Sequence, residues 1–361
     1  MNKRQKSIDK AIVVAIDRED VPVLSCFARF CAFWHIFHIC LVRYGTELLG
    51  ELRENIWKID LEEYRESFHG EDQTALLKPI GDLGYSGSTF FITPDTKYLV
   101  KSLPRRFEYK FFERDMFRQY YEHMVAHPTS FLVHITDYLT PAYHTVGSVA
   151  NIIPTHHIVM ENILYGKTAQ TKEDEWETYD LKPSEYFFPQ RDMLPKQMTS
   201  PGTMKRVINV FDDKVRLTQR QFSELRTMLA TDTAFLRRAN VVDYSLFLVR
   251  FPARVNPARP DDRALSSTLQ RRDSACEADA RAGKDESWRR GVKSADGKWT
   301  YRAVLLDFMW SKHQLRAQAT TGAVMLFNLL ARKGDMSITT TPEDYRKTFL
   351  EMVENIVEVC E

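Results

Sequence analysis

The sequence has almost no net charge and few cysteines. Its 361 residues carry 50 Lys and Arg against 49 Asp and Glu, a formal net charge of +1. This balance excludes a globally basic nucleic-acid binder, although it still allows a local basic face. No CxxC pair and no zinc knuckle occurs among the five cysteines, which are Cys26, Cys31, Cys40, Cys276 and Cys360. We therefore expect no disulfide framework and no structural zinc, and a reducing, cytoplasmic setting fits better.

The sequence also lacks a clean hydrophobic run of membrane-spanning length. Residues 23–42 are almost continuously apolar, but Arg29, His35 and His38 interrupt them. A central arginine costs roughly 2.5 kcal/mol or more on insertion scales. The run begins too far along the chain, and lacks the small-residue cleavage site, for an ordinary signal peptide. The pattern favours a buried helix or a contact with a membrane surface over a transmembrane span.

Large apolar residues are scarce in one internal segment. Residues 253–298 are rich in Arg, Asp, Ser, Ala and Pro, a composition typical of a disordered insertion. Residues 1–20 are polar and charged, and we expect them to form a loose arm.

The remaining chain is a mixture of strand and helix patterns. Strands are expected near residues 89–93, 98–103, 131–139, 157–162, 241–251 and 301–308, and helices over 44–56, 60–68, 107–124, 218–236 and from 341 onward. Asp60 with Glu63, and Thr218 with Gln221, form capping-box patterns. Thr341 caps the last helix and is followed by the proline favoured at the first helical position. Because no βαβ alternation is seen, the fold class is α+β rather than a doubly wound sheet.

A glycine-rich turn lies between two of the expected strands. The turn reads GDLGYSGS, and its residues Gly84, Ser86, Gly87 and Ser88 suit a nest of backbone N–H groups that binds an anion. A plain hairpin turn would have a similar sequence. Lys101 lies on a following strand, and a lysine beside a glycine-rich loop is the arrangement by which kinases hold the α- and β-phosphates. The alternative for Lys101 is an ordinary surface lysine.

Two aspartates lie within apolar, strand-like runs. Asp243 occurs in NVVDYSLFLV and Asp307 in YRAVLLDFMW. An unpaired carboxylate is costly in such a setting, so each needs a partner, and Mg²⁺ suits both if phosphates lie nearby. Taken singly, either aspartate could be a strand-end residue that faces solvent.

Several motifs together resemble one known family. GYSGSTFF, YLVKSL, HIVMENILYG, the YDLK segment, FLRRANVVDYSLFLV, AVLLDF and GDMSITTTPEDYRKTFLEMV occur in the order and approximate spacing of the phosphatidylinositol phosphate kinases. The resemblance covers roughly residues 45–361, and residues 253–298 fall where that family carries a variable insert. VMENILYG and NVVDYSLF are most similar to the phosphatidylinositol 3-phosphate 5-kinase branch.

The resemblance implies a fold, an activity and a partner. The fold would be a two-lobed, protein-kinase-like α+β structure with antiparallel sheets: an arm and apolar helix over 1–43, an N-terminal lobe over 44–166, and a C-terminal lobe over 167–361. The activity would be transfer of the γ-phosphate of ATP, with Mg²⁺, to the inositol ring of a phosphatidylinositol phosphate in an anionic membrane surface. Cytoplasmic, peripheral membrane localisation follows, and a homodimer is an open alternative.

The resemblance also implies roles for individual residues. Gly84, Ser86, Gly87, Ser88 and Lys101 would bind the ATP phosphates, with Asn162 and Ile163 beside adenine. Asp307 would coordinate Mg²⁺, and Asp243 would orient or deprotonate the inositol hydroxyl. Asp180 and Lys182 would face the transferred or substrate phosphate. Apart from the resemblance, Lys312 and Arg316 lie near an apolar run, Val324–Leu330, and this pattern suits contact with an anionic lipid surface, although a core helix over Val324–Leu330 is an open alternative. Glu108 and Glu113 both remain candidates to pair with Lys101.

The sequence departs from the family pattern after the DLK motif. Pro183 and Ser184 stand where the family has glycine and serine, and proline fixes φ and removes an N–H. Lys312-His313 replaces the usual Lys-Lys pair. These departures leave two alternatives open: a catalytically weak pseudokinase that acts as a membrane or interaction scaffold, and a kinase for a soluble inositol phosphate.

Overall fold

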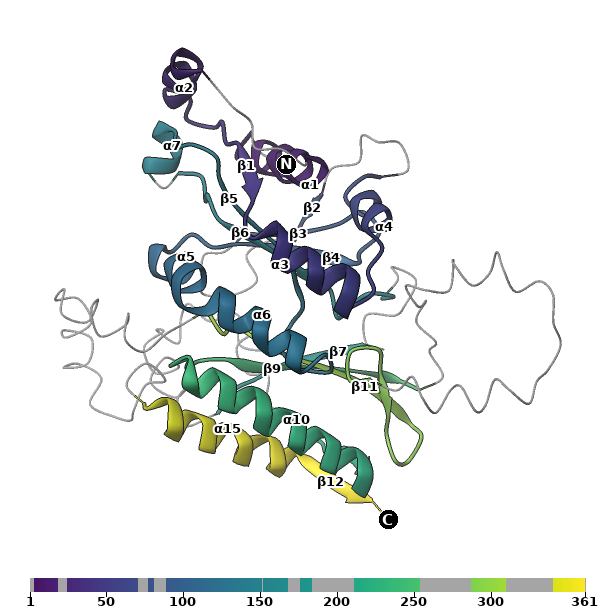
Figure 1. Ribbon diagram of the computed structural model, residues 1–361. Helices are drawn as coiled ribbons and strands as arrows, with labels where there is room; N and C mark the ends of the chain where they lie inside the picture. Colours follow the sequence, from purple (N-terminus) through teal and green to yellow (C-terminus); the bar gives the residue numbers. More distant parts are fainter. Residues whose placement is uncertain are drawn as a thin grey trace, which may run out of the picture. The chain divides into compact units, whose positions relative to one another are not determined.

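The chain divides into two units, each with its own sheet. The computed structural model describes residues 3–18, 25–70, 77–80, 89–150, 152–167, 176–183, 211–253, 287–309 and 340–360. Unit 1 contains Met1–Pro128 and Val133–Tyr165, and unit 2 contains Thr129–Leu132 and Gly166–Glu361. Figure 1 shows the helices and strands of both units.

Unit 1 is built on a six-stranded antiparallel sheet. The strand order is β1-β5-β6-β4-β3-β2. The bounds are β1 Leu41–Arg43, β2 Lys78–Pro79, β3 Phe90–Ile92, β4 Tyr98–Ser102, β5 Ile135–Pro141 and β6 His157–Glu161. Residues alternate between the two faces of a strand, so Val100 on β4 and Val159 on β6 enter one core while Lys101 lies on the opposite face. The strands expected near 89–93, 98–103, 131–139 and 157–162 are thereby confirmed.

Helix α1, Lys3–Asp17, packs on the Val100 face of this sheet. Ile8, Ile12 and Ile16 recur every four residues, so they form one apolar stripe, and all three are fully buried. The expectation of a loose arm over residues 1–20 is therefore wrong for 3–17. Charged residues before Ile8 and after Ile16 lower the average hydrophobicity of the segment without interrupting its helical periodicity.

Two long helices of unit 1 each contain a π-helical turn. α3, Thr46–Glu51, continues into η1, Leu52–Ile56, and α5, Arg106–Phe111, continues through η2, Phe112–Met116, into α6, Phe117–Ala126. The rings of Phe112 and Tyr138 lie 4.9 Å apart, which places the second helix on the sheet face opposite α1. The helices expected over 44–56 and 107–124 are confirmed.

Three short helices complete unit 1. α4 is Leu61–Glu66, α7 is Val146–Val149 and α2 is Cys26–Phe33. Asp60 caps α4 as expected, but its expected partner Glu63 contacts Lys97 at 3.3 Å instead. α2 exposes most of its aromatic side chains, so a buried helix in the apolar segment 23–42 is not what forms. Among the described residues, no helix is long and apolar enough to cross a membrane.

Unit 2 contains a four-stranded antiparallel sheet covered by two helices. Its strand order is β10-β11-β9-β7, and a separate pair, β12-β8, is parallel. The bounds are β7 Glu177–Leu181, β8 Val215–Thr218, α10 Gln219–Arg238, β9 Ser245–Pro252, β10 Val292–Lys293, β11 Trp299–Leu306, α15 Pro342–Ile356 and β12 Val357–Cys360. Thr218 and Gln221 form the expected capping box, and Thr341 caps α15. Tyr345 of α15 packs at 4.8 Å on Tyr244, which precedes β9.

The last part of the expected disordered insertion is ordered. Residues 287–298 include β10, which pairs with β11, and the side chains of Trp288 and Val292 are buried. Two apolar residues in a polar segment were enough to fix this hairpin on the sheet. Residues 254–286, the larger part of the expected insertion, lie outside the described residues.

Candidate active site

Strand register brings four of the expected site residues to one end of the sheet of unit 2. Leu181 on β7 pairs with Leu246 on β9, and Ser245 on β9 pairs with Leu306 on β11. The residues next to these pairs are Asp180 on β7, Lys182 just after β7, Asp243 before β9 and Asp307 after β11. We call these four residues the Lys182 cluster.

Lys182 is the central cation of this cluster. Its side chain is 10% exposed, and its Nζ lies 3.4 Å from Oδ1 of Asp243. Burial lowers the pKa of Lys182, but the carboxylates of Asp243, Asp307 and Asp180 outweigh this, so its pKa lies above the ordinary value. Lys182 therefore carries its charge at neutral pH. Its contact with Asp243 forms although Pro183 follows it, so the altered DLK motif does not displace the lysine.

Asp180 is crowded by other charges although solvent reaches it. The protein packed around its carboxylate raises the pKa of Asp180. Lys182 lowers this pKa, whereas Asp307 and Asp243 raise it further. Three carboxylates that repel one another in this way would stabilise a cation bound among them.

Two aspartates of the cluster, Asp243 and Asp307, have a left-handed backbone conformation. Asp243 has φ 67° and Asp307 has φ 61°. Non-glycine residues seldom adopt this conformation, and it persists only where the surrounding structure enforces it. Buried neighbours supply that enforcement: Val242 and Tyr244 flank Asp243, and Leu305 and Phe308 lie on either side of Asp307. The chain thus turns sharply at each aspartate while its neighbours stay anchored in the core.

The Lys182 cluster suits a divalent cation held jointly with phosphate. Its ligand atoms are carboxylate oxygens, which are the hard donors that Mg²⁺ prefers, and Mg²⁺ is usually held by one or two carboxylates plus phosphate oxygens. No group of three or more His, Cys, Asp or Glu side chains in the described parts of the chain is arranged as a ready-made metal site. The residues fit Mg²⁺ that arrives with ATP, and Asp307 and Asp180 are the carboxylates that could hold it.

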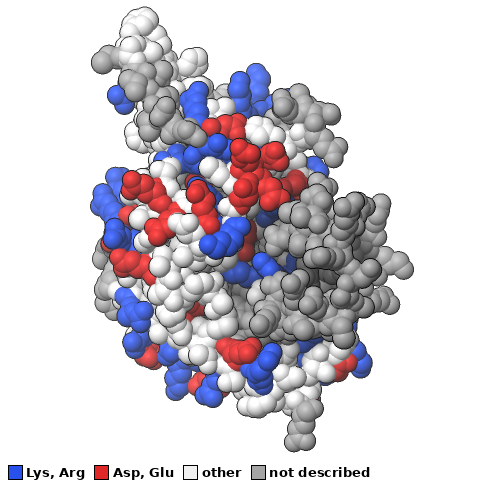
Figure 2. Space-filling view, turned by 45° about the vertical axis from the view of Figure 1, so that its right-hand side comes forward, with Lys and Arg blue, Asp and Glu red and all other residues white. Residues whose placement is uncertain are grey.

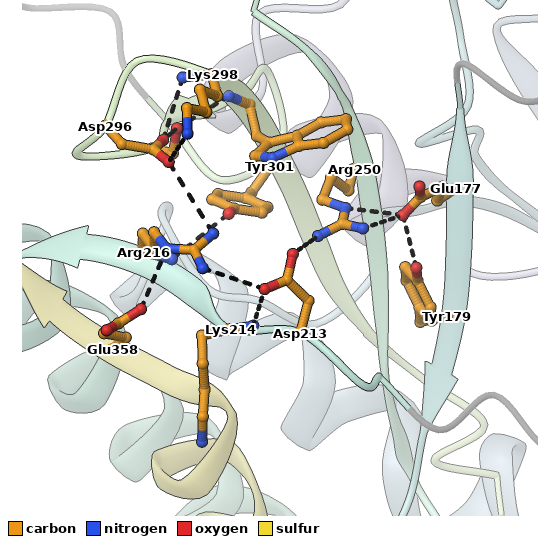
Figure 3. Close-up of polar contacts among 12 residues, drawn as sticks. Glu177, Tyr179, Asp213, Lys214, Arg216, Arg250, Asp296, Lys298, Tyr301 and Glu358 are labelled. Carbon is orange, nitrogen blue, oxygen red and sulfur yellow. Dashed lines mark hydrogen bonds and ion pairs between the residues drawn. The ribbon is translucent and has the colours of Figure 1, made fainter.

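A second charged cluster lies at the other end of β7 (Figure 3). Arg250 on β9 contacts Glu177 through Nε at 2.7 Å and Asp213 through Nη1 at 2.6 Å. Its guanidinium also lies 4.4 Å from the centre of the Trp299 ring. A hydrogen bond from the Lys214 backbone and one from Arg250 lower the pKa of Asp213. We call Glu177, Asp213 and Arg250 the Arg250 cluster.

The Arg250 cluster extends through neighbouring side chains. Tyr179 donates a hydrogen bond to Glu177 at 2.6 Å, and Arg216 contacts Asp213 at 3.3 Å and Glu358 at 3.1 Å. These contacts tie β7, β8, β9 and β12 together (Figure 3), and β7 is the strand that carries Asp180. Sequence reasoning missed this cluster. Its signal was an arginine inside the apolar run SLFLVRFP, which required buried partners as the two aspartates did.

In unit 1, Lys101 lies in the middle of the sheet. It pairs with Phe90 on β3 and Ile158 on β6, and its Nζ lies 5.6 Å from the centre of the Phe90 ring. Of the two glutamates considered as its partner, Glu113 accepts a hydrogen bond from Tyr138 at 2.9 Å and lies 3.4 Å from His156.

The other glutamate, Glu108, also contacts a cation. It is buried on α5, and Arg105 lies 3.8 Å from one of its oxygens. Both glutamates therefore have partners of their own, and the pairing of Lys101 with either of them stays a prediction.

The side chain of Asn162 is used within the protein. Its Nδ2 donates to the Thr96 carbonyl at 2.7 Å, and its Oδ1 accepts from the Leu164 N–H at 3.1 Å. Asn162 thus ties the end of β6 to the β3–β4 hairpin, and Ile163 beside it is buried. Each of these two atoms keeps a second hydrogen-bonding position, so the expected place of Asn162 beside adenine stays a prediction.

Six expected site residues lie outside the described residues: Gly84, Ser86, Gly87, Ser88, Lys312 and Arg316. Their expected roles stay predictions. Figure 2 shows basic and acidic side chains interspersed on the face that it presents, in agreement with the net charge of +1.

Comparison with known proteins gives two matches. The family model described as Phosphatidylinositol-4-phosphate 5-Kinase matches residues 72–356. A probable phosphatidylinositol phosphate kinase of Dictyostelium discoideum is 26% identical over 205 residues, which cover 54% of this chain and 25% of that protein. The chain therefore matches about a quarter of the length of this curated relative.

Proposed function

Because the chain belongs to the phosphatidylinositol-4-phosphate 5-kinase family, we propose that it transfers the γ-phosphate of ATP to an inositol hydroxyl of a phosphatidylinositol phosphate. The observation that carries the proposal is the meeting of Lys182 with Asp180, Asp243 and Asp307 at one end of a sheet. Phosphoryl transfer requires mainly positioning and neutralisation of charge, and this cluster offers both.

Asp243 is the proposed contact to the lipid hydroxyl. Its side chain is 28% exposed, so a substrate can reach it, and its carboxylate oxygens can accept a hydrogen bond from the hydroxyl. The Lys182 ammonium is placed to neutralise the transferred phosphate as well. Its rigid position between carboxylates would reduce the entropy lost when the phosphate binds.

Asp307 and Asp180 are the proposed ligands of the metal. Bound Mg²⁺ supplies charge neutralisation at the β- and γ-phosphates. The left-handed backbone at Asp307 fixes the direction in which its carboxylate leaves the strand end. The mutual repulsion among the carboxylates predicts that binding of ATP with Mg²⁺ stabilises unit 2.

In unit 1, Lys101 is the proposed ligand of the ATP phosphates and Glu108 its partner. Glu108→Gln should lower kcat/KM for ATP by about tenfold or more, because the lysine loses a charged partner in a buried setting. Glu113→Gln is the matched comparison, since it alters the same helix but a carboxylate held by Tyr138 and His156. An equal loss in both variants would contradict the assignment of Glu108.

The proposed lipid is phosphatidylinositol 3-phosphate, with transfer to the 5-hydroxyl. The motifs VMENILYG and NVVDYSLF favour this branch of the family. Lys312, Arg316 and the glycine loop at Gly84–Ser88 are proposed to contact the lipid and the ATP phosphates. The two-lobed kinase-like arrangement, the membrane-peripheral location and the alternative of a homodimer belong to the same proposal. The pseudokinase alternative has no support over an active kinase, since Lys182 keeps its contact with Asp243.

The test is transfer of labelled phosphate from ATP to vesicles that each contain one phosphoinositide. The proposal expects a labelled lipid, with phosphatidylinositol 3-phosphate preferred. Labelling of another phosphoinositide would overturn the choice of lipid but not of reaction. Labelling of free inositol phosphates alone would favour the soluble-substrate alternative, and no transfer to any acceptor would favour the pseudokinase.

A further inference from the structure

Unit 1 carries an apolar surface that nothing in the proposed reaction requires. Its members are Phe27, Phe30, Phe33 and Trp34 of α2, Ile36 and Phe37 just after it, and Val149 and Ile152 at α7. We call this set the α2 surface. Phe27 is 78%, Phe30 63%, Trp34 64% and Val149 69% exposed. A contiguous group of exposed aromatic side chains of this kind normally marks an interaction site.

Helix α2 is a well-formed helix, so these side chains are not exposed because the segment is frayed. Ser25 caps it by accepting a hydrogen bond from the Ala28 N–H at 3.2 Å. Phe27, Phe30 and Trp34 recur at three and four residues, so they lie on one side. The Trp34 ring packs edge-on against Phe30 at 6.3 Å and against Phe33 at 5.6 Å. The aromatic rings thus form a connected group.

The α2 surface is also fastened to the body of unit 1. Thr145 donates a hydrogen bond to the His38 carbonyl at 3.2 Å, and His38 contacts the Tyr143 hydroxyl at 2.9 Å. The Ile36 carbonyl lies so close to Gly147 that a Cβ there would meet it at 1.7 Å. Only glycine allows this approach of the two backbones. As a result, α2 projects from unit 1 beside α7 (Figure 1).

The charges around the α2 surface indicate what kind of partner it binds. Neither residues 25–42 nor residues 141–153 contain an aspartate or glutamate, and Arg29 on α2 is exposed. In Figure 2 the described atoms of the projecting end are white apart from blue, with no red among them. Phe and Trp are enriched where proteins enter the headgroup boundary of a bilayer, and a nearby cation favours anionic lipids.

The geometry fits a bilayer better than a protein groove. An eight-residue helix is only about 12 Å long, too short to span a membrane but long enough to lie in its interface. A projecting, convex group of rings needs a matching groove on a protein partner, whereas a fluid bilayer adapts to it. We propose that the α2 surface inserts into the headgroup boundary of an anionic lipid bilayer. This contact would hold the enzyme at the membrane separately from the lipid bound for catalysis.

The proposal is tested by sedimentation of the full chain with phosphatidylcholine vesicles that contain roughly one fifth phosphatidylserine. The triple variant Phe27→Ser, Phe30→Ser, Trp34→Ser should partition at least about tenfold more weakly, because three aromatic side chains lose their burial in lipid. The control, Val125→Ser with Val359→Ser, removes exposed apolar side chains elsewhere and should bind as the wild type does. Arg29→Glu should weaken binding to the anionic vesicles and leave binding to pure phosphatidylcholine unchanged.

A second measurement does not depend on the folding of the triple variant. Bromine-labelled lipid should quench part of the tryptophan fluorescence of the wild type, and Trp34→Phe should remove that part while it retains binding. Equal sedimentation of wild type and triple variant, or quenching that survives Trp34→Phe, would overturn the proposal. The proposal would also be overturned if the wild type forms an oligomer and the triple variant does not, since a second copy of the chain would then cover the α2 surface.

The readouts separate this inference from the proposed function. Vesicle binding needs no catalysis, so it can hold even if no lipid is phosphorylated. If the chain is a kinase, the triple variant should phosphorylate a dispersed, short-chain phosphoinositide at the wild-type rate. If the triple variant loses this activity but still binds vesicles normally, the α2 surface acts in catalysis and not as a separate membrane contact.

Discussion

The two charged clusters at the ends of β7 differ in their balance. In the Arg250 cluster one guanidinium meets two carboxylates, Arg216 adds a further cation, and the arginine lies against an aromatic ring. In the Lys182 cluster three carboxylates act on one ammonium, and two of the aspartates have left-handed backbone. The first arrangement is complete within the protein. The second has strain and surplus negative charge, which are the features expected where a ligand supplies the missing charge.

The comparison predicts opposite responses to the loss of one charge. Removing a carboxylate from the Lys182 cluster should abolish function and spare the fold. Removing the cation from the Arg250 cluster should weaken the fold.

The largest expected effect is on activity in Asp307→Asn. Asparagine also tolerates left-handed backbone, so the turn should persist while the proposed metal ligand is weakened. We expect lipid phosphorylation to fall about 100-fold or more, with a melting temperature equal to or above that of the wild type, because carboxylate repulsion decreases. Asp212→Asn, an exposed aspartate of the same unit, is the control. A large loss of stability with normal activity would reverse the assignment of the cluster.

The next effect is on stability in Arg250→Ala. The variant leaves Glu177 and Asp213 without their cation, and we expect the free energy of unfolding in urea to fall by about 2–3 kcal/mol, less than for a fully buried pair because both acids are partly exposed. Arg226→Ala breaks an exposed ion pair with Glu354 and should cost less than about 1 kcal/mol. Similar losses in the two variants would mean that the Arg250 cluster is no more than a surface feature.

A buried carboxylate in unit 1, Asp9, allows a third test, because its effect on stability should depend on pH. Asp9 is fully buried on α1, where Oδ1 accepts the Leu77 N–H at 2.8 Å and Oδ2 has no hydrogen-bond partner among the described residues. Burial raises the pKa of Asp9 from 3.8 to about 6. Unlike in the Lys182 cluster, the pKa of Asp9 is set by burial and by the hydrogen bond from Leu77, and no ligand is proposed for its charge.

The sign of the Asp9 effect follows from its raised pKa. The protonated form is favoured by folding, so its contribution to stability is present below pH 3.8 and is lost as the pH rises through about 6. Relative to wild type, Asp9→Asn should gain up to about 3 kcal/mol in free energy of unfolding between pH 4 and pH 7. Urea titrations of both proteins across this range measure the difference. A constant difference would show that Asp9 does not titrate in this range.

Local patterns predicted the elements well and long-range contacts poorly. Thr218 with Gln221 marks a helix start because both partners of the capping box are close in sequence. The strand that carries Lys101, and the strands that Asp243 precedes and Asp307 follows, were likewise evident. Their placement was not, because the meeting of Asp243 and Lys182 depends on a strand register that no local pattern specifies.

The failures share a physical cause. α1 was missed because the charged residues on either side of the short apolar run 11–16 outweighed it in the average over residues 1–20. Residues 287–298 were taken as disordered because two buried side chains are a small fraction of a polar segment.

The position of α1 has a consequence for synthesis of the chain. Its isoleucines are buried together with Leu139 and Val159, which leave the ribosome long after them. At roughly 5–20 residues per second, the stretch from Ile16 to Val159 takes on the order of ten seconds to translate. During that time the stripe has no sheet to cover, so these isoleucines stay exposed until β6 has been made.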